Sequence, residues 1–298
     1  MVQSVAFKRV ATGGKMGRKH KSLEELTIRD NFMFVKVFSN EEIAKPFLKA
    51  LLKIDIERVT IVGEAQQQAN PNKKYIRFDV VVKDDTADGI GRVFDLEMQM
   101  VNTGELPKRA RYYQGICDVE TLASSHRYKE LKEQYVIFLC PEDIFKKERP
   151  IYEFENREKN DHSLTLGDLT YKIFLNFSKY DAVTDESVRD YLKYFATDEA
   201  TTAVTQAIQS KVNFFHKDPK TRSDYMTFEA MLEEERDEAR AEGREEGLAK
   251  GEEKGRKEER QLAEAEKFES ARKLIEHGVS REIVIQSMGL SESQIKVL

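Results

Sequence analysis

The chain has 298 residues, of which 40% are hydrophobic and 35% charged, and its formal net charge is −5. No apolar run approaches the roughly 18 to 20 residues that span a membrane, and the basic N-terminus lacks the apolar segment of a secretion signal, so we expect a cytoplasmic protein without a membrane partner. The two cysteines lie far apart and the five histidines never fall at ligand spacing, so the sequence gives no support to a zinc centre.

Residues 1–22 are expected to form a basic, disordered arm. They carry six basic side chains and no acidic one, because the first acidic residue is Glu24. Two interpretations are open: the arm lies along a nucleic-acid backbone, or it is a solubilising tail. The acidic residues are concentrated later, within residues 229–270, so any contact with DNA depends on local basic patches.

Two helices and a strand are predicted next. Ser22 and Glu25 have the spacing of a capping box, and an apolar helical face continues from there to Phe38. Residues 41–53 have the pattern of a second amphipathic helix. A strand is expected within residues 57–68, and it would join the following strands in one sheet.

Residues 75–99 show the clearest pattern in the chain, two apolar stretches that alternate with polar residues and are joined by an Asp- and Gly-rich turn. Successive side chains of a strand point to opposite faces, so the pattern predicts an antiparallel hairpin with one apolar face. The other face carries Asp79 on the first strand and Asp95, Glu97 and Gln99 on the second.

This pairing brings Asp79 and Glu97 within reach of one divalent cation, with Gln99 two residues further along the same face. Oxygen ligands from two carboxylates, together with the backbone carbonyl of Met98 and water, suit Mg²⁺ or Mn²⁺. Such an ion polarises a phosphate oxygen and acidifies a bound water. The face therefore predicts a site for phosphodiester hydrolysis in which Asp79, Glu97 and Met98 hold the metal.

A helix over residues 107–122 and a buried strand over residues 134–140 follow, and the strand–helix–strand order predicts a parallel pair. Arg109 lies near the start of this helix, close in sequence to the Glu97 strand, and is expected to steady a phosphate. For Tyr113, burial in the core is favoured over a contact with phosphate or base. The remaining strands and helices of the core are expected at residues 151–155, 171–177 and 186–215.

The C-terminal part of the chain is charged and rich in glycine. Glycines recur every four residues, at Gly243, Gly247, Gly251 and Gly255. Each costs roughly 1 kcal/mol against alanine in a helix, so the helical linker expected at residues 221–269 either gains a compensating contact, in a homodimer or against the core, or is frayed. Residues 270–298 predict a small helical hairpin, because Gly278 and Gly289 end two short helices. We favour packing or dimerisation over DNA reading there, since the second helix carries few basic residues.

The order of these residues resembles the PD-(D/E)XK nuclease superfamily: Asp79, then Glu97-x-Gln99 on the next strand, then a helix that opens near Arg109. More narrowly, the stretch Asp30-Asn31-Phe32-Met33-Phe34 and the Glu- and Gly-rich tail are similar to its bacterial branch of PD-(D/E)XK family transposases, also called recombination-promoting nucleases. A match to Asp79 and Glu97-x-Gln99 alone would be weak, whereas the combined order is fairly specific.

The resemblance implies an α/β fold with a restriction-endonuclease-like core at residues 23–220, in which helices flank a mixed β-sheet, and a C-terminal helical appendage. It implies a Mg²⁺- or Mn²⁺-dependent DNA endonuclease associated with recombination or mobile elements. Asp30 approaches the metal centre by resemblance, or else caps a helix start. The superfamily usually has Lys where this chain has Gln99, and a neutral amide orients the attacking water by hydrogen bonds alone. The alternative hypothesis is a nuclease-like protein that binds DNA or assembles without cutting.

Overall fold

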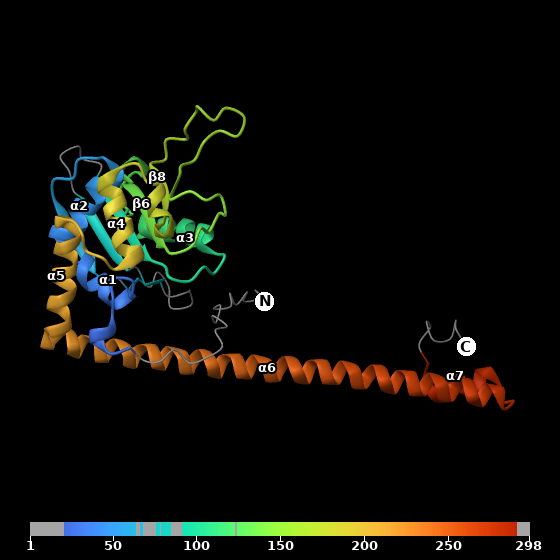
Figure 1. Cartoon of the computed structure of the whole chain (residues 1–298). Coiled ribbons are helices and arrows are strands. Elements are labelled where there is room, and N and C mark those ends of the chain that lie inside the picture. Colours follow the sequence, from blue (N-terminus) through green and yellow to red (C-terminus); the bar gives the residue numbers. More distant parts are fainter. Residues whose placement is uncertain are drawn as a thin grey trace. The chain divides into compact units, whose positions relative to one another are not determined.

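The computed structural model of the chain describes residues 21–63, 66–67, 76–77, 79–84, 91–122 and 124–290. The chain divides into two compact units, residues 1–230 and 231–298 (Figure 1). Residues 1–20 of the expected basic arm and the turn at residues 85–90 lie outside the described residues. Among the described helices, none combines the length and the apolar content needed to cross a membrane.

The first unit is built on a six-stranded mixed sheet with the strand order β1–β4–β5–β6–β8–β7. Its strands are β1 (Val59–Gly63), β4 (Val80–Asp84), β5 (Arg92–Met98), β6 (Glu133–Cys140), β7 (Ile151–Phe154) and β8 (Thr170–Asn176). The neighbours β5, β6 and β8 run parallel, whereas β1, β4 and β7 pair antiparallel with their neighbours. A separate small sheet pairs β2 (Gln66–Gln67) with β3 (Ile76–Arg77).

The β4–β5 hairpin has the register that the alternating sequence predicts. Val80 pairs with Leu96 and Val82 pairs with Phe94, and all four side chains are fully buried in the larger of two hydrophobic clusters on the sheet. Val81, between them, belongs to the cluster on the opposite face. Because a shift of one residue would send every side chain to the wrong face, the alternation fixes this register.

Helices flank the sheet, which confirms the predicted α/β fold class. The larger cluster is shared by α1 (Asn31–Phe38), α2 (Glu41–Leu52), α4 (Glu186–Thr197) and α5 (Ala203–Lys217), and the smaller one by α3 (Leu106–Thr121). Phe34, Phe38 and Phe47 are fully buried where α1 and α2 meet, and burial of a side chain of this size contributes roughly 1.5–3 kcal/mol. α3 connects the parallel strands β5 and β6, as the strand–helix–strand order predicts.

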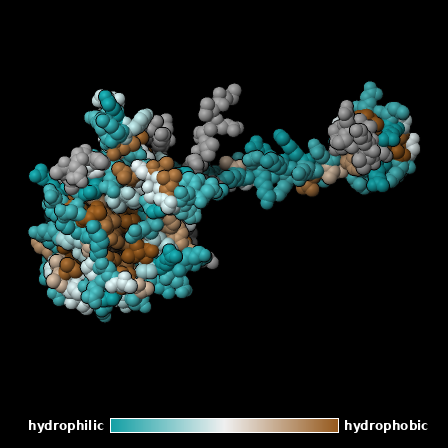
Figure 2. Space-filling model, turned by 90° about the horizontal axis from the view of Figure 1, so that it is seen from above, coloured by the Kyte–Doolittle hydropathy of each residue, from teal (hydrophilic) through white to brown (hydrophobic). Residues whose placement is uncertain are grey.

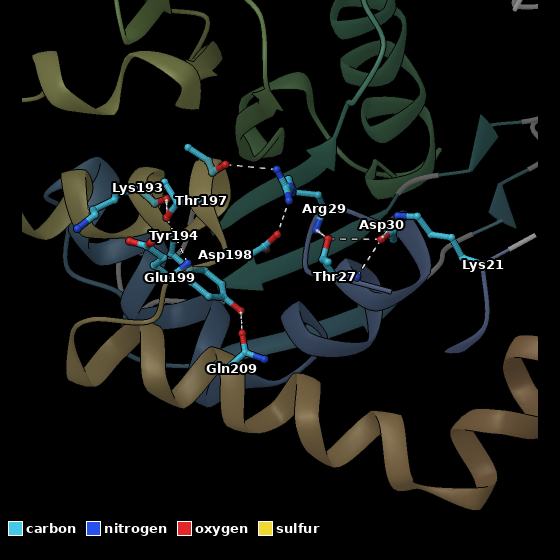
Figure 3. Close-up of polar contacts among 11 residues, drawn as sticks. Lys21, Thr27, Arg29, Asp30, Lys193, Tyr194, Thr197, Asp198, Glu199 and Gln209 are labelled. Atoms are coloured by element: carbon cyan, nitrogen blue, oxygen red, sulfur yellow. Dashed lines mark hydrogen bonds and ion pairs between the residues drawn. The ribbon is translucent and has the colours of Figure 1, made fainter. Parts of the chain in front are cut away.

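Polar contacts tie the segment before α1 to the rest of the first unit (Figure 3). Arg29 forms an ion pair with Asp198, just after α4, and donates a hydrogen bond to the carbonyl oxygen of Ala196 (3.3 Å). The predicted capping box forms, with the backbone N–H of Ser22 donating to Glu25 Oε2 (2.7 Å). It caps the short 3-10 helix η1 (Leu23–Glu25), and α-helical structure begins only at α1. Two further 3-10 helices are η2 (Tyr128–Glu130) and η3 (Phe177–Ala182).

The second unit contains most of α6 (Pro219–Glu276) and all of α7 (Arg281–Met288). Its small core joins Ala271 of α6 to Val284 and Leu290. Gly278 and Gly289 follow the ends of α6 and α7 with φ of 90° and 55°, the left-handed conformation in which glycine commonly ends a helix. Helices therefore end at both glycines, as predicted, but only α7 is short. The first helix is the end of α6, which runs without a break from Pro219 through the expected boundary at residue 270.

The four evenly spaced glycines lie within α6. A methyl group placed at Gly243, Gly247, Gly251 or Gly255 would meet no described atom within 4 Å. Residues 231–270 are nearly all exposed, and hydrophilic residues cover most of the side of α6 that faces the viewer in Figure 2. Ion pairs four residues apart on α6, such as Lys250–Glu246 and Lys257–Glu253, offset part of the cost of these glycines. No packing contact from another described element is found at the four glycines, and a homodimer through this region stays a proposal.

Candidate active site

Asp79 and Glu97 lie together where two inner strands of the six-stranded sheet meet its end, at the start of β4 and the end of β5. Asp79 immediately precedes β4, and Glu97 is the penultimate residue of the neighbouring strand β5. The backbone N–H of Asp79 donates to Glu97 Oε1 (3.2 Å), and Asp79 Oδ2 accepts from the backbone N–H of Met98 (2.9 Å). The two residues are only 7% and 1% exposed. The structure thus brings together the two carboxylates that the hairpin pattern places on one face.

Arg109, near the start of α3, connects this pair to Gln99. Its guanidinium forms an ion pair with Glu97 and donates hydrogen bonds to Gln99 Oε1 (2.5 Å) and to the Tyr113 hydroxyl (2.6 Å). The Gln99 amide in turn donates to the carbonyl oxygen of Val101 (2.6 Å). Because a guanidinium only donates and a carbonyl only accepts, these contacts determine which way the Gln99 amide points.

The structure adds two residues to the site that the sequence does not place there, Asn31 and Tyr113. Asn31, the first residue of α1, donates through Nδ2 to Asp79 Oδ1. The core position predicted for Tyr113 agrees with its 7% exposure, yet its hydroxyl also holds Arg109. The sequence signals for Asn31 are its place in the stretch that resembles the transposase branch and an amide side chain at the head of an otherwise apolar run.

The described contacts of Asp30 lie within its own segment. Its oxygens accept hydrogen bonds from Lys21 Nζ at 2.7 and 2.8 Å and from the backbone N–H of Thr27 at 2.8 Å (Figure 3). Asp30 occupies the N-cap position of α1, although its side chain makes no capping hydrogen bond to the helix. The contact with Asp79 comes from the next residue, Asn31, so these bonds favour a local structural role for Asp30 over a place at the metal centre.

Asp95 is a third buried carboxylate on the same face. It lies two residues before Glu97 and is 5% exposed, and neither of its oxygens accepts a hydrogen bond from the described residues. Together with Tyr113, Cys117 and Gln134 it borders a recess of about 70 Å³ beneath α3. The sequence places Asp95 on this face, and burial without a partner is what distinguishes it in the structure.

The buried charges shift one another's pKa. Burial raises the pKa of Asp95 well above its usual value, the charge of Asp79 adds to this effect, and Arg109 opposes it. The pKa of Glu97 is raised by burial and by the charges of Asp79 and Asp95, against the opposing effect of Arg109. Burial disfavours the charged form of Arg109, but Glu97 raises its pKa, so it stays a cation. Three buried carboxylates thus share one guanidinium. Without a further cation, burial and mutual repulsion favour protonation of Asp95 and Glu97, and a bound cation would favour their charged forms.

The donor set fits a hard divalent cation. Carboxylate oxygens from Asp79 and Glu97 and the carbonyl oxygen of Met98 are ligands that Mg²⁺ and Mn²⁺ prefer, and a carboxylate oxygen that accepts one hydrogen bond keeps a lone pair. The unpartnered carboxylate of Asp95 beside them adds charge to be compensated. Among the described residues, no three His, Cys, Asp or Glu side chains are already grouped to hold a metal. A cation at Glu97 therefore competes with Arg109.

Comparison with known proteins gives one match. No curated protein and no solved structure matched the chain. The family model of the PD-(D/E)XK nuclease family transposase matches residues 28–250, a region that holds Asp79, Glu97, Gln99 and Arg109. Since this match extends over most of the sequence and agrees with the mixed sheet and its flanking helices, the chain belongs to the PD-(D/E)XK nuclease family transposases.

Proposed function

We propose that the protein is a metal-dependent DNA endonuclease that hydrolyses phosphodiester bonds in association with recombination or mobile elements. Membership of the family supports a nuclease with a link to mobile elements. The observation that carries the finer proposal is the meeting of Asp79 and Glu97 at the ends of two adjacent strands, joined by a hydrogen bond from the backbone of one to the carboxylate of the other.

Each residue of the site has a role in this proposal. Asp79, Glu97 and the Met98 carbonyl would hold Mg²⁺ or Mn²⁺, which supplies polarisation of a phosphate oxygen and a lowered pKa for a bound water. Gln99 orients the attacking water, because its amide oxygen, already held by Arg109, keeps a second lone pair that accepts from an O–H.

Arg109 supplies the positive charge that Gln99 lacks. Its guanidinium lies against both Glu97 and Gln99, and its planar fork suits two oxygens of one phosphate. Glu97 and a substrate phosphate therefore compete for the same guanidinium. Arg109 is released toward the phosphate once Glu97 has another positive partner, which couples metal binding to substrate binding.

The test is incubation of the purified protein with supercoiled plasmid DNA, with and without Mg²⁺. Asp79→Asn and Glu97→Gln keep the size of the side chain and remove its charge, so each should abolish Mg²⁺-dependent nicking while a thermal transition shows that the fold is retained. Glu153→Gln, at an exposed carboxylate on β7, is the matched control and should nick like the wild type. Equal nicking by Asp79→Asn and the wild type would refute the assignment.

A nuclease-like protein that binds DNA without cutting it is the second candidate. It is favoured by the lack of a ready group of three metal-binding side chains among the described residues and by the pairing of Glu97 with Arg109. Titration with Mn²⁺ separates the candidates: an active enzyme binds Mn²⁺ in the millimolar range or tighter, which raises the Tm of the wild type and leaves that of Glu97→Gln unchanged. A wild type whose Tm does not respond to Mn²⁺ favours the non-cutting protein.

A further inference from the structure

The loop that follows β6, residues 141–150, leaves the sheet at the same edge as the candidate site. β5 and β6 run parallel with Met98 in register with Leu139, and the backbone N–H of Gln99 donates to the carbonyl oxygen of Leu139 (2.9 Å). β6 ends one residue later, at Cys140. The loop therefore begins beside the end of the strand that carries Glu97.

Arg109 lies close to the start of this loop. The central carbon of its guanidinium is 5.4 Å from the centre of the Phe138 ring, on β6. Burial raises the pKa of Cys140 to about 12, and this pKa is lowered by the charge of Arg109 and raised by that of Glu142. Cys140 is thus within electrostatic range of both the site and the loop.

One carboxylate holds the loop in a fixed conformation. Asp143 accepts hydrogen bonds from the four backbone N–H groups of residues 145–148, at 2.6 to 3.0 Å, and from the Tyr152 hydroxyl at 2.7 Å. Lys146 and Glu148 adopt left-handed backbone conformations, with φ of 55° and 57°, which are unfavourable for residues other than glycine. Such strain persists only where the surrounding contacts impose it, and it often marks a functional segment.

The loop presents cations that the described residues leave without an ion pair. Lys146, Lys147 and Arg149 are all exposed, and none forms an ion pair within the described part of the chain. Holding the exposed residues of this loop in one conformation costs conformational entropy, and because they are exposed, no burial of their side chains offsets that cost. A rigid loop with unpaired cations beside a phosphodiester site is typical of a surface that binds phosphate.

We propose that Lys146, Lys147 and Arg149 bind the phosphate backbone of DNA on one flank of the candidate site. The inference rests on the proposed nuclease function and names the surface that positions its substrate. Contacts to phosphate fix the position of the duplex without reading its sequence. Glu142, Asp143 and Glu148 lie in the same loop and equal the three cations in number. Asp143 is directed to the backbone of the loop, so binding depends on local contacts of the exposed cations, and the loop contributes only a few charges to the salt dependence of binding.

The test measures the affinity of the full chain for a fluorescently labelled DNA duplex by anisotropy, in EDTA, over a range of salt concentrations. The variant K146Q/K147Q/R149Q removes three charges and leaves the main-chain bonds to Asp143 in place. We expect weaker binding and a slope of log K against log salt that is shallower by about 0.9 for each lost phosphate contact, hence by up to roughly 2.7. The control R127Q/K129Q neutralises exposed cations at the opposite end of β6 and should bind like the wild type.

The outcomes separate this inference from the proposed function. An unchanged affinity and slope in K146Q/K147Q/R149Q would overturn the inference, and the nuclease function would still stand if the wild type nicks plasmid and Asp79→Asn does not. Losses of slope in the loop variant and in R127Q/K129Q that follow the three and two charges removed would indicate general attraction to DNA and would also overturn the inference. A wild type that fails to bind DNA in EDTA would overturn the inference, whereas the nuclease function is decided separately by plasmid nicking with and without Mg²⁺.

Discussion

Replacing Asp95 with Asn should stabilise the metal-free protein, although most substitutions of buried residues are destabilising. Asp95 is 5% exposed, and its two oxygens have no hydrogen-bond partner among the described residues. A buried polar group left unsatisfied costs about 1–3 kcal/mol, and a charged one costs more. Asn has nearly the same shape and is also polar, but it carries no charge. Asp95→Asn therefore removes the part of the cost that comes from the charge and should raise the free energy of unfolding by about 1 kcal/mol or more near pH 8. In a unit of this size, each kcal/mol raises Tm by roughly 2–4 °C.

The difference between Asp95→Asn and the wild type should also depend on pH. Because burial and the charge of Asp79 raise the pKa of Asp95, the folded protein binds more protons than the unfolded chain between the unfolded pKa, about 4, and the raised folded pKa. The stability of the wild type therefore falls as pH rises through this window, and the Asn variant lacks that component. The pKa of Glu97 is raised too, partly by the charge of Asp95, so Glu97 adds a trend of the same sign to both proteins and a smaller one to the Asn variant. The difference between the two proteins therefore measures Asp95 together with its effect on Glu97.

Urea denaturation in EDTA between about pH 5 and pH 8 measures this difference. Asp84→Asn is the matched control, because Asp84 is equally buried but paired with Arg92 (3.3 Å), and loss of that pairing should destabilise the protein. If Asp95→Asn proves less stable than the wild type near pH 8, the ionised carboxylate of Asp95 has a stabilising partner and the reasoning is wrong.

Three further predictions concern Arg109, the anchoring ion pair and the second unit. Arg109→Lys should slow plasmid nicking by at least about tenfold in initial-rate measurements, since one ammonium cannot contact Glu97, Gln99 and a phosphate as a guanidinium can; an unchanged rate would remove Arg109 from the site. Arg29→Met should lower the free energy of unfolding by about 1 kcal/mol in urea titration, because the half-buried Asp198 loses its ion-pair partner, and an unchanged free energy would make that pair unimportant. In sedimentation, the full chain should be a homodimer and a chain that ends at Ala230 a monomer; two monomers would contradict dimerisation through the second unit.

The part of the site that lies on the β4–β5 hairpin could be predicted because it depends on local alternation. A period of two in apolar residues determines which side chains share a face, and the apolar face then determines the register. Asp79 and Glu97 are separated by a single turn, so no long-range information is needed to bring them together. The same holds for the parallel pairing of β5 and β6, which follows from the helix between them.

The contribution of α1 could not be predicted in this way, because it depends on where the helix begins. Asp30 and Asn31 are adjacent polar residues, and the resemblance to the family points to Asp30, not Asn31, as a residue that approaches the metal centre. The helix starts at Asn31, while Asp30 keeps an extended backbone and turns its carboxylate back to Thr27. Which of the two reaches Asp79, 48 residues further along the chain, is settled by packing of α1 against the sheet.

The neutral side chain of Gln99 suggests a site without a positive charge when the sequence is considered alone, and the structure shows otherwise. Taken along the strand, a Gln where the superfamily usually has Lys removes a positive charge from the site. In the structure, Arg109 places its guanidinium on Gln99 Oε1 and on Glu97, so a positive charge is present at this point and comes from α3. α3 begins soon after β5 ends, and its early residues therefore lie at the sheet edge that carries Glu97. The charge of this site is a property of Asp79, Glu97, Gln99 and Arg109 together, and the residue at position 99 alone is no argument for an inactive protein.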